Sequence, residues 1–360
     1  MEDMKKTAFN QAHRDLKANL MNFAGWELPA WYTSITDEHK ACRTSVAMWD
    51  VSDMGRLWIT GKNARDFLDK VLSKPVSSMK WGMSQLCVML LEDGGILDDL
   101  WVYAVEPNRY AIVWNAGDHE KKLEWLKRWQ ADDPDIVIED VLMKTAMLSV
   151  QGPQINALKA SKNFLDLPRF GNRIAKIGNI ETFTARTGYT GEDGLEIVVD
   201  AGDAEALWNM FMNEGVKPGG LGARDMLRIE AGLLLSGTDF DSSRNLYEAA
   251  YSWVAELDTH EFIGKEAMLK IKDHGVRQKH IGFKVEGREI ARAGHKIVKN
   301  EKEIGIVTSG TPSLTLGFNI GFGYVDIDEA KLGNEFDIII RNKPVRAILT
   351  NRKFYSRKEQ

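Results

Sequence analysis

The 360-residue sequence has little cysteine, little net charge and no long apolar segment. Cys42 and Cys87 are too few for a disulfide scaffold or for a zinc site made of cysteines alone. The 47 Lys and Arg residues nearly balance the 52 Asp and Glu residues, for a net charge of −5. That balance excludes a basic surface for nucleic acid and a polybasic membrane anchor. No segment reaches the ~18 consecutive apolar residues of a spanning helix, so we expect neither nucleic acid nor a membrane as a partner.

The sequence also lacks the short motifs of the common cofactor and catalytic sites. It has no G-x-x-x-x-G-K-S/T, no H-E-x-x-H and no G-x-S-x-G. Gly188, Gly191 and Gly194 have the wrong spacing for a dinucleotide-binding loop. The seven histidines are scattered, with no pair at ligand spacing, so we predict no metal site. Any cofactor must therefore be bound by the shape of a pocket.

Residues 1–15 are mostly polar and lack the basic and apolar regions of a secretory signal. A reduced, cytoplasmic location is therefore expected. A mitochondrial matrix protein from which the transit peptide has been removed would look the same.

Tryptophan is abundant, with 11 Trp against 8 Tyr. A buried indole needs a partner for its N–H, so many indoles indicate packing or ligand binding. The composition is otherwise typical of a globular chain, with 44% hydrophobic and 28% charged residues. At roughly 100–200 residues per domain, the length predicts two or three domains.

Strand and helix patterns follow one another irregularly, which predicts an α+β fold with mainly antiparallel strands. Helices are expected at 64–72, 119–129, 203–213 and 222–234, among strands at 55–60, 103–105, 110–114, 146–150 and 180–185. The polar stretch 272–279 is the best domain boundary. After it, short strands separated by turns predict a small all-β barrel or sandwich of about 80 residues. These strands are expected at 281–285, 295–298, 304–309, 320–325, 336–340 and 345–349.

Two neighbouring acids, Asp98 and Asp99, follow the Gly94-Gly95 turn inside an otherwise apolar strand. Because side chains alternate along a strand, the two acids face opposite sides, and one of them is directed to the interior. A buried carboxylate is costly unless it is hydrogen-bonded or paired, and its pKa shifts accordingly. The alternative is that one Asp caps the turn and the other is exposed.

The segment Arg186–Glu196 contains three glycines at three-residue spacing, which lets a loop approach a flat ligand closely. Tyr189 offers a ring and a hydroxyl. Glu196 offers a carboxylate that accepts two parallel N–H bonds, which suits the amino-pyrimidine edge of a pterin or guanine. The alternative is a structural glycine-rich hairpin with solvated acids.

The segment Pro218–Glu230 starts a helix near Gly222, which places Arg224 and Asp225 in the first helical turn. Arg224 there can pair with a ligand carboxylate through its guanidinium fork, aided by the helix N-terminus. The alternative is a structural Arg–Asp pair. The segment Gly237–Asp241 is a further turn with two acids.

These four segments, in this order and spacing, resemble the T-protein of the glycine cleavage system, a family of folate-dependent aminomethyltransferases. The resemblance runs from about Thr7 to Tyr355, and its motifs are individually short but specific together. Further matches are Asn22–Pro29, Trp49–Ser52, Val150–Pro153, Phe262–Ala267 and Val307–Gly310.

The resemblance implies a three-domain, cloverleaf-like body around a central folate channel. Two interleaved α+β domains would occupy residues 1–275, and a C-terminal β-barrel would occupy residues 276–360. The implied enzyme takes the aminomethyl carbon from the dihydrolipoyl arm of the lipoyl-carrying H-protein. It transfers that carbon to tetrahydrofolate, releasing ammonia and giving 5,10-methylenetetrahydrofolate.

The resemblance also implies roles for particular residues, by matching position. Asp99 is implied as the catalytic carboxylate, which can stabilise developing iminium charge and position or deprotonate the attacking folate amine. Trp101 and Trp114 flank the Asp99 and Asn115 segments, so we expect them at the ligand channel. The residues implied to bind folate are Met54, Asn115, Tyr189, Glu196 and Arg224.

The sequence departs from the family pattern at several positions. Asp53 stands where the family usually has histidine. Leu86 stands where it often has tyrosine, which removes a ring and a hydroxyl from the expected pocket wall. Residues 115–118 and 245–248 also differ from the usual pattern. These departures keep a second function open, a tetrahydrofolate-dependent demethylase of a small methylated sulfur or nitrogen compound.

A third alternative is a non-catalytic, folate-binding iron–sulfur assembly factor. Such relatives carry a cysteine motif of the form K-G-C-Y-x-G-Q-E. Neither Cys42 nor Cys87 lies in that motif, and both are expected to be small core residues.

Overall fold

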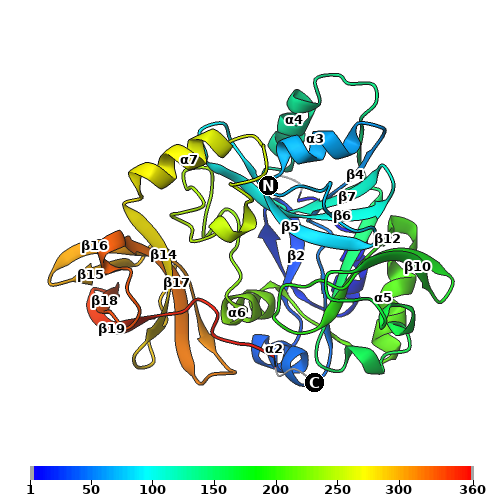
Figure 1. The fold of residues 1–360 in the computed structure, drawn as a ribbon. Coiled ribbons are helices and arrows are strands. Elements are labelled where there is room, and N and C mark those ends of the chain that lie inside the picture. The colour runs from blue at the N-terminus through cyan, green and yellow to red at the C-terminus, as the bar shows by residue number, and fades with distance from the viewer. Residues whose placement is uncertain (1–3, 358–360) are drawn as a thin grey trace.

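The computed structural model describes residues 4–357, whose arrangement is shown in Figure 1. Two large sheets lie on one side of the molecule and a closed barrel on the other, with helix α6 (Leu221–Ala231) between them. The predicted α+β fold with mainly antiparallel strands and a C-terminal barrel is confirmed. The expected extension of α6 to residue 234 is wrong, because Gly232 takes a left-handed conformation (φ 79°) that ends the helix.

The first sheet has five antiparallel strands in the order β5-β6-β7-β4-β8. Two helices, α3 (Ala64–Val71) and α4 (His119–Gln130), bury their apolar residues in the core of this sheet. Its strands are β4 (Gly55–Thr60), β5 (Met83–Leu90), β6 (Ile96–Glu106), β7 (Arg109–Trp114) and β8 (Val137–Asp140).

The second sheet has six strands in the order β10-β11-β12-β9-β3-β13. Because β3 precedes the five-stranded sheet in the chain and β9 follows it, the two sheets interleave along the sequence. Helix α5 (Ala204–Asn213) packs Trp208 and Phe211 into its core. Its strands are β3 (Ala47–Asp50), β9 (Thr145–Gln151), β10 (Asn172–Ile177), β11 (Ile180–Ala185), β12 (Gly194–Asp200) and β13 (Lys217–Pro218).

The barrel closes in the order β14-β17-β16-β15-β18-β19, and every strand expected in this part of the chain is present. Helix α7 (Lys265–His274) leads into it. We propose residues 1–275 and 276–360 as the domain bounds. The barrel strands are β14 (Gln278–Val285), β15 (Lys296–Lys299), β16 (Lys302–Ser313), β17 (Phe318–Asp326), β18 (Glu335–Ile340) and β19 (Lys343–Thr350).

The remaining elements near the N-terminus are short. They are α1 (Asn10–Asp15), the hairpin of β1 (Asn19–Phe23) and β2 (Trp26–Trp31), and α2 (Ile35–Thr44). Cys42 and Cys87 are fully buried thiols, as expected of core residues. Within residues 4–357, no helix is both long and apolar enough to cross a membrane.

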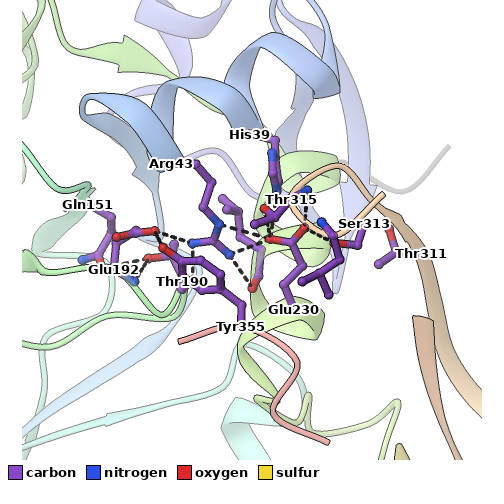
Figure 2. Close-up of polar contacts among 12 residues, drawn as sticks. His39, Arg43, Gln151, Thr190, Glu192, Glu230, Thr311, Ser313, Thr315 and Tyr355 are labelled. Carbon is purple, nitrogen blue, oxygen red and sulfur yellow. Dashed lines mark hydrogen bonds and ion pairs between the residues drawn. The ribbon is translucent and has the colours of Figure 1, made fainter. Parts of the chain in front are cut away.

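A buried polar cluster joins α2, α6, the end of β16 and the C-terminal segment, as shown in Figure 2. Glu230 Oε2 lies 3.0 Å from His39 Nε2 and accepts from Arg43 Nη2 at 2.7 Å. Its other oxygen accepts from Ser313 Oγ at 2.6 Å. We call this cluster the Glu230 junction; it consists of His39, Arg43, Glu192, Glu230, Ser313, Thr315 and Tyr355.

The Glu230 junction holds its central carboxylate in the charged form. Burial alone would raise the pKa of Glu230, but hydrogen bonding and charge from His39, with Ser313 and Arg43, lower it to about 2. Arg43 also donates from Nη1 to the carbonyl of Thr190 at 2.8 Å and to Glu192 at 2.9 Å. The junction therefore braces the loop that carries Tyr189.

A second buried cluster ties α6 to the barrel around Asp239. The Asp239 carboxylate pairs with Arg228 of α6 and accepts from Thr308 at 2.6 Å and from Ser309 at 2.7 Å. Burial would raise the pKa of Asp239, but the charge of Arg228 and the nearby His280 lower it. Helix α6 is thus fixed to the barrel by one carboxylate and to α2 by another.

Candidate functional site

A cavity of about 260 Å³ is lined by both sheets, by α6 and by residues 234–238. Two of the departures from the family pattern, Asp53 and Leu86, line it, as do Trp101 and Trp114, the tryptophans expected there. All six residues predicted for the site line this same cavity; they are Met54, Asp99, Asn115, Tyr189, Glu196 and Arg224.

Asp53 and Met54 reach the cavity on the turn between β3 and β4, where the chain passes from one sheet to the other. Arg56 fixes this turn by donating to the carbonyl oxygens of Ser52 at 3.0 Å and Leu142 at 2.7 Å. Glycine is required at position 55, since a Cβ there would lie 1.9 Å from Trp114 Nε1. Burial raises the pKa of Asp53 to about 6, although the charge of Arg224 opposes this.

The two acids of β6 face opposite sides of the sheet, as the alternation predicts. Asp98 is 0% exposed and accepts from Lys122 Nζ at 2.6 Å and from Asn115 Nδ2 at 2.8 Å, whereas Asp99 faces the cavity. The alternative, that one of these two acids caps the Gly94-Gly95 turn and the other is exposed, is wrong. The turn is capped by Asp93, which accepts from Gly95 N at 3.0 Å, and neither acid of the strand is exposed.

Both oxygens of Asp99 have a hydrogen-bond donor. Oδ1 accepts from Asn115 Nδ2 at 2.7 Å, and Oδ2 accepts from the Tyr251 hydroxyl at 2.8 Å. Burial, and next the charge of Asp98, raise the pKa of Asp99 to about 7, although these two hydrogen bonds oppose the rise. The raised pKa makes Asp99 a better proton acceptor than an ordinary carboxylate, which suits a group that stabilises charge or moves a proton.

The glycine-rich loop before β12 presents Tyr189 to the cavity, and β12 itself presents Glu196. Thr187 Oγ1 donates to Glu196 Oε2 at 2.5 Å, and the Tyr189 hydroxyl donates to the carbonyl of Leu234. Burial raises the pKa of Glu196, against the hydrogen bond from Thr187. The alternative of a hairpin with solvated acids is wrong, because Glu196 is only 5% exposed.

Arg224 lies in the first turn of α6, as expected, and its guanidinium faces the cavity. Its Cζ atom lies 4.8 Å from the centroid of the Tyr189 ring, and its Nη2 atom lies 3.8 Å from Met54 Sδ. The alternative of a structural pair with Asp225 is wrong, because Asp225 pairs with Arg228 at 2.8 Å. In the part of the chain that the structure describes, Arg224 forms no ion pair.

Two residues at the site were not predicted, Lys122 and Tyr251. The sequence offered a signal for Lys122, because helical spacing places it on the same face as Leu126 and Trp129. In the structure Lys122 is only 2% exposed. The sequence offered no signal for Tyr251, because its hydroxyl reaches Asp99 across 152 positions of the chain. Across residues 4–357, no group of three or more His, Cys, Asp and Glu side chains is arranged to hold a metal ion.

Two family models match nearly the whole chain. One, described as the GCVT N-terminal domain, matches residues 9–259, and the other, the glycine cleavage T-protein C-terminal barrel domain, matches residues 278–356. The chain belongs to the glycine cleavage T-protein family. The resemblance expected from the sequence is thereby confirmed.

Individual relatives agree with this membership. The aminomethyltransferases of Herpetosiphon aurantiacus and Halothermothrix orenii are each 39% identical to this chain, over 98% and 95% of its length and 98% and 97% of theirs. The crystal structure of glycine cleavage system aminomethyltransferase T from Bartonella henselae superposes with a TM-score of 0.92 at 29% identity and covers 98% of both chains. These relatives support the expected aminomethyltransferase function and favour neither of the two alternatives.

Proposed function

We propose that this protein transfers the one-carbon unit of an aminomethyl group from the dihydrolipoyl arm of an H-protein to tetrahydrofolate. The products are 5,10-methylenetetrahydrofolate and ammonia. The observation that carries the proposal is the position of Asp99, a carboxylate with a raised pKa that lines the same cavity as Glu196 and Arg224. The names of the relatives agree with this reaction.

The cavity residues fit a reduced folate. Glu196 is buried, and among the described residues its Oε1 atom accepts no hydrogen bond, so it can accept from the N–H groups of a pterin edge. Tyr189 offers its aromatic ring in the same cavity. Arg224, whose Cζ atom lies 4.8 Å from the centroid of that ring, forms no ion pair among residues 4–357 and can bind the polar groups of the ligand. Met54 and Asn115 complete the walls.

Tetrahydrofolate supplies the amine that accepts the one-carbon unit. The part that this chain plays in the chemistry is centred on Asp99. Cleavage of the S–C bond of the carrier builds positive charge on the CH2–N unit, which a neighbouring carboxylate stabilises in a site of low dielectric. The same carboxylate orients the attacking amine and takes its proton.

The reaction is tested in the direction of carrier loading. Formaldehyde and tetrahydrofolate form 5,10-methylenetetrahydrofolate, and the enzyme with ammonia and reduced lipoyl carrier then gives aminomethylated carrier and free tetrahydrofolate. Mass spectrometry of the carrier should show enzyme-dependent aminomethylation that requires ammonia. Carrier with an oxidised lipoyl disulfide is the control and should remain unmodified.

Two other results would contradict the proposal. If no loaded carrier forms and the protein instead transfers a methyl group from a small onium donor to tetrahydrofolate, it is a demethylase. If the protein binds tetrahydrofolate and performs neither reaction, its role is an accessory one.

A further inference from the structure

The wall of the cavity beside Asp99 is apolar at Leu86. In the register of β5 and β6, Val88 lies opposite Asp99 and Leu86 lies opposite Trp101. Leu86 is therefore the diagonal neighbour of Asp99 on the same face of the sheet, and both residues line the cavity. A tyrosine at position 86 would stand within reach of the Asp99 carboxylate, and leucine leaves that place without a donor.

A different segment supplies the donor. Tyr251 follows α6 by some twenty positions, lies just before the short helix Ser252–Val254, and donates its hydroxyl to Asp99 Oδ2 at 2.8 Å. Its side chain joins the same buried apolar cluster as Val88, against which Leu86 packs. The Tyr251 ring thus approaches Asp99 on the same face of the sheet as Leu86.

The structure fixes Tyr251 firmly. The residue is 6% exposed, and its ring packs against Phe240 and Trp253 with centroid distances of 5.9 and 5.4 Å. Arg352, beyond the last barrel strand, donates to the carbonyl oxygens of Ala249 at 2.7 Å and Ala250 at 2.6 Å. The hydroxyl is therefore held in one place by the surrounding protein and does not depend on a ligand for its position.

We infer that Tyr251 is the positioning residue of Asp99 and provides, from another segment, the hydroxyl that Leu86 lacks. The inference rests on the proposed role of Asp99. With Asn115 on one oxygen and Tyr251 on the other, the carboxylate has a single orientation toward the cavity. The hydroxyl also favours the charged form, because a hydrogen bond donated to a carboxylate lowers its pKa.

The first test is Tyr251→Phe, which keeps the ring and removes only the hydroxyl. With saturating folate and carrier we expect kcat to fall roughly tenfold and KM to change little, as for loss of a hydrogen bond to a charged group. The acidic midpoint of the pH–rate profile should move to higher pH, since the remaining carboxylate loses a donor that lowers its pKa. An unchanged kcat together with an unchanged midpoint would overturn the inference.

Tyr247→Phe is the matched control. It makes the same substitution four positions earlier, at a buried hydroxyl that has no hydrogen-bond partner among residues 4–357. This variant should keep the kcat and pH midpoint of the wild type. If it lost as much activity as Tyr251→Phe, the effect would belong to the packing of the segment, and the inference would be wrong.

The second test moves the hydroxyl back to the sheet. Tyr251→Leu combined with Leu86→Tyr exchanges the two side chains across the same apolar cluster. We expect this double variant to recover most of the kcat that Tyr251→Leu alone loses, and the wild-type pH midpoint. A double variant as slow as the single one would refute the equivalence of the two positions.

A direct titration separates this inference from the proposed function. In protein labelled with carbon-13 at the aspartate carboxyl groups, the Asp99 signal is the one that Asp99→Asn removes. Tyr251→Phe should raise the midpoint of that signal whether or not the protein loads a carrier. If the wild type loads no carrier but the Asp99 midpoint rises in Tyr251→Phe, the proposed function is wrong and the inference about Tyr251 is confirmed. An unchanged midpoint would mean that the Tyr251 hydroxyl does not affect the protonation of Asp99, and the inference would be wrong.

Discussion

The cavity on one side, and the Glu230 junction and the Asp239 cluster (together called the two junctions) on the other, all remove carboxylates from water. The pKa values of the carboxylates in the cavity and at the junctions move in opposite directions. At the junctions, His39, with Ser313 and Arg43, lowers the pKa of Glu230, and Arg228 lowers that of Asp239. In the cavity, burial outweighs the available donors and raises the pKa of Asp53, Asp99 and Glu196.

The difference shows what each region does. A buried carboxylate that is surrounded by cations and hydroxyls is already satisfied, so it holds elements together and has nothing left for a ligand. A buried carboxylate with fewer partners has a high desolvation cost in its charged form, and a bound cation or N–H donor can lower that cost. Helix α6 joins the two regions, with Arg224 at the cavity and Arg228 and Glu230 at the junctions.

The largest expected effect comes from breaking a junction. Glu230→Ala leaves the buried Arg43 without its main partner, which should cost about 3–5 kcal/mol of stability. Thermal unfolding should show a much lower Tm, and Glu230→Gln should show a smaller loss. Arg346→Ala, at an exposed pair with Glu335, is the control and should leave the Tm close to that of the wild type. A Glu230→Ala protein as stable as this control would contradict the structural role of the junction.

An effect of middle size is expected from comparing two arginines of the same helix. Arg224→Met should raise the Kd for tetrahydrofolate about tenfold while Tm stays near that of the wild type, because Arg224 has no ion pair within the described residues. Arg228→Met should instead lower Tm, because it leaves Asp239 buried and unpaired. Calorimetric binding and thermal unfolding measure both properties. If Arg224→Met lost stability and kept its affinity, the division between the two regions would fail.

The smallest expected effect is a gain in stability at the site. The folded-state pKa of Asp99, about 7, lies above the ordinary value near 4, so the charged carboxylate costs stability that grows as the pH rises from about 4 through 7. Asp99→Asn removes this cost. Its Tm should exceed that of the wild type by roughly 2 °C or more at pH 8, with a narrower gap at pH 5. A difference that does not depend on pH would exclude a raised pKa at Asp99.

Much of the fold could be predicted because its signals are local. The alternation in the C-terminal third predicts every barrel strand, and the helical spacing of residues 119–129 predicts α4 within one residue. The end of α6 was missed because a glycine can either end a helix by taking the left-handed conformation or lie within the helix, and residues 222–234 alone do not decide which.

The site was predictable where residues cluster in sequence and was missed where only folding brings them together. Asp99, Glu196 and Arg224 lie in segments dense in glycine and charge, and all three line the cavity. The pairing of Lys122 with Asp98 and of Tyr251 with Asp99 joins residues from distant elements. Alternation predicted that one acid of the Asp98-Asp99 pair faces inward, but Asp98 takes the core and Asp99 the cavity only because of these partners.

The most direct measurement is the turnover of Asp99→Asn in the carrier-loading reaction, with tetrahydrofolate binding measured on the same preparation. Asparagine keeps the size of the side chain and removes its charge. We expect a folded protein with a tetrahydrofolate Kd near that of the wild type and a turnover reduced more than tenfold at saturating folate. Wild-type turnover in this variant would contradict the claim that the cavity carboxylate performs the chemistry.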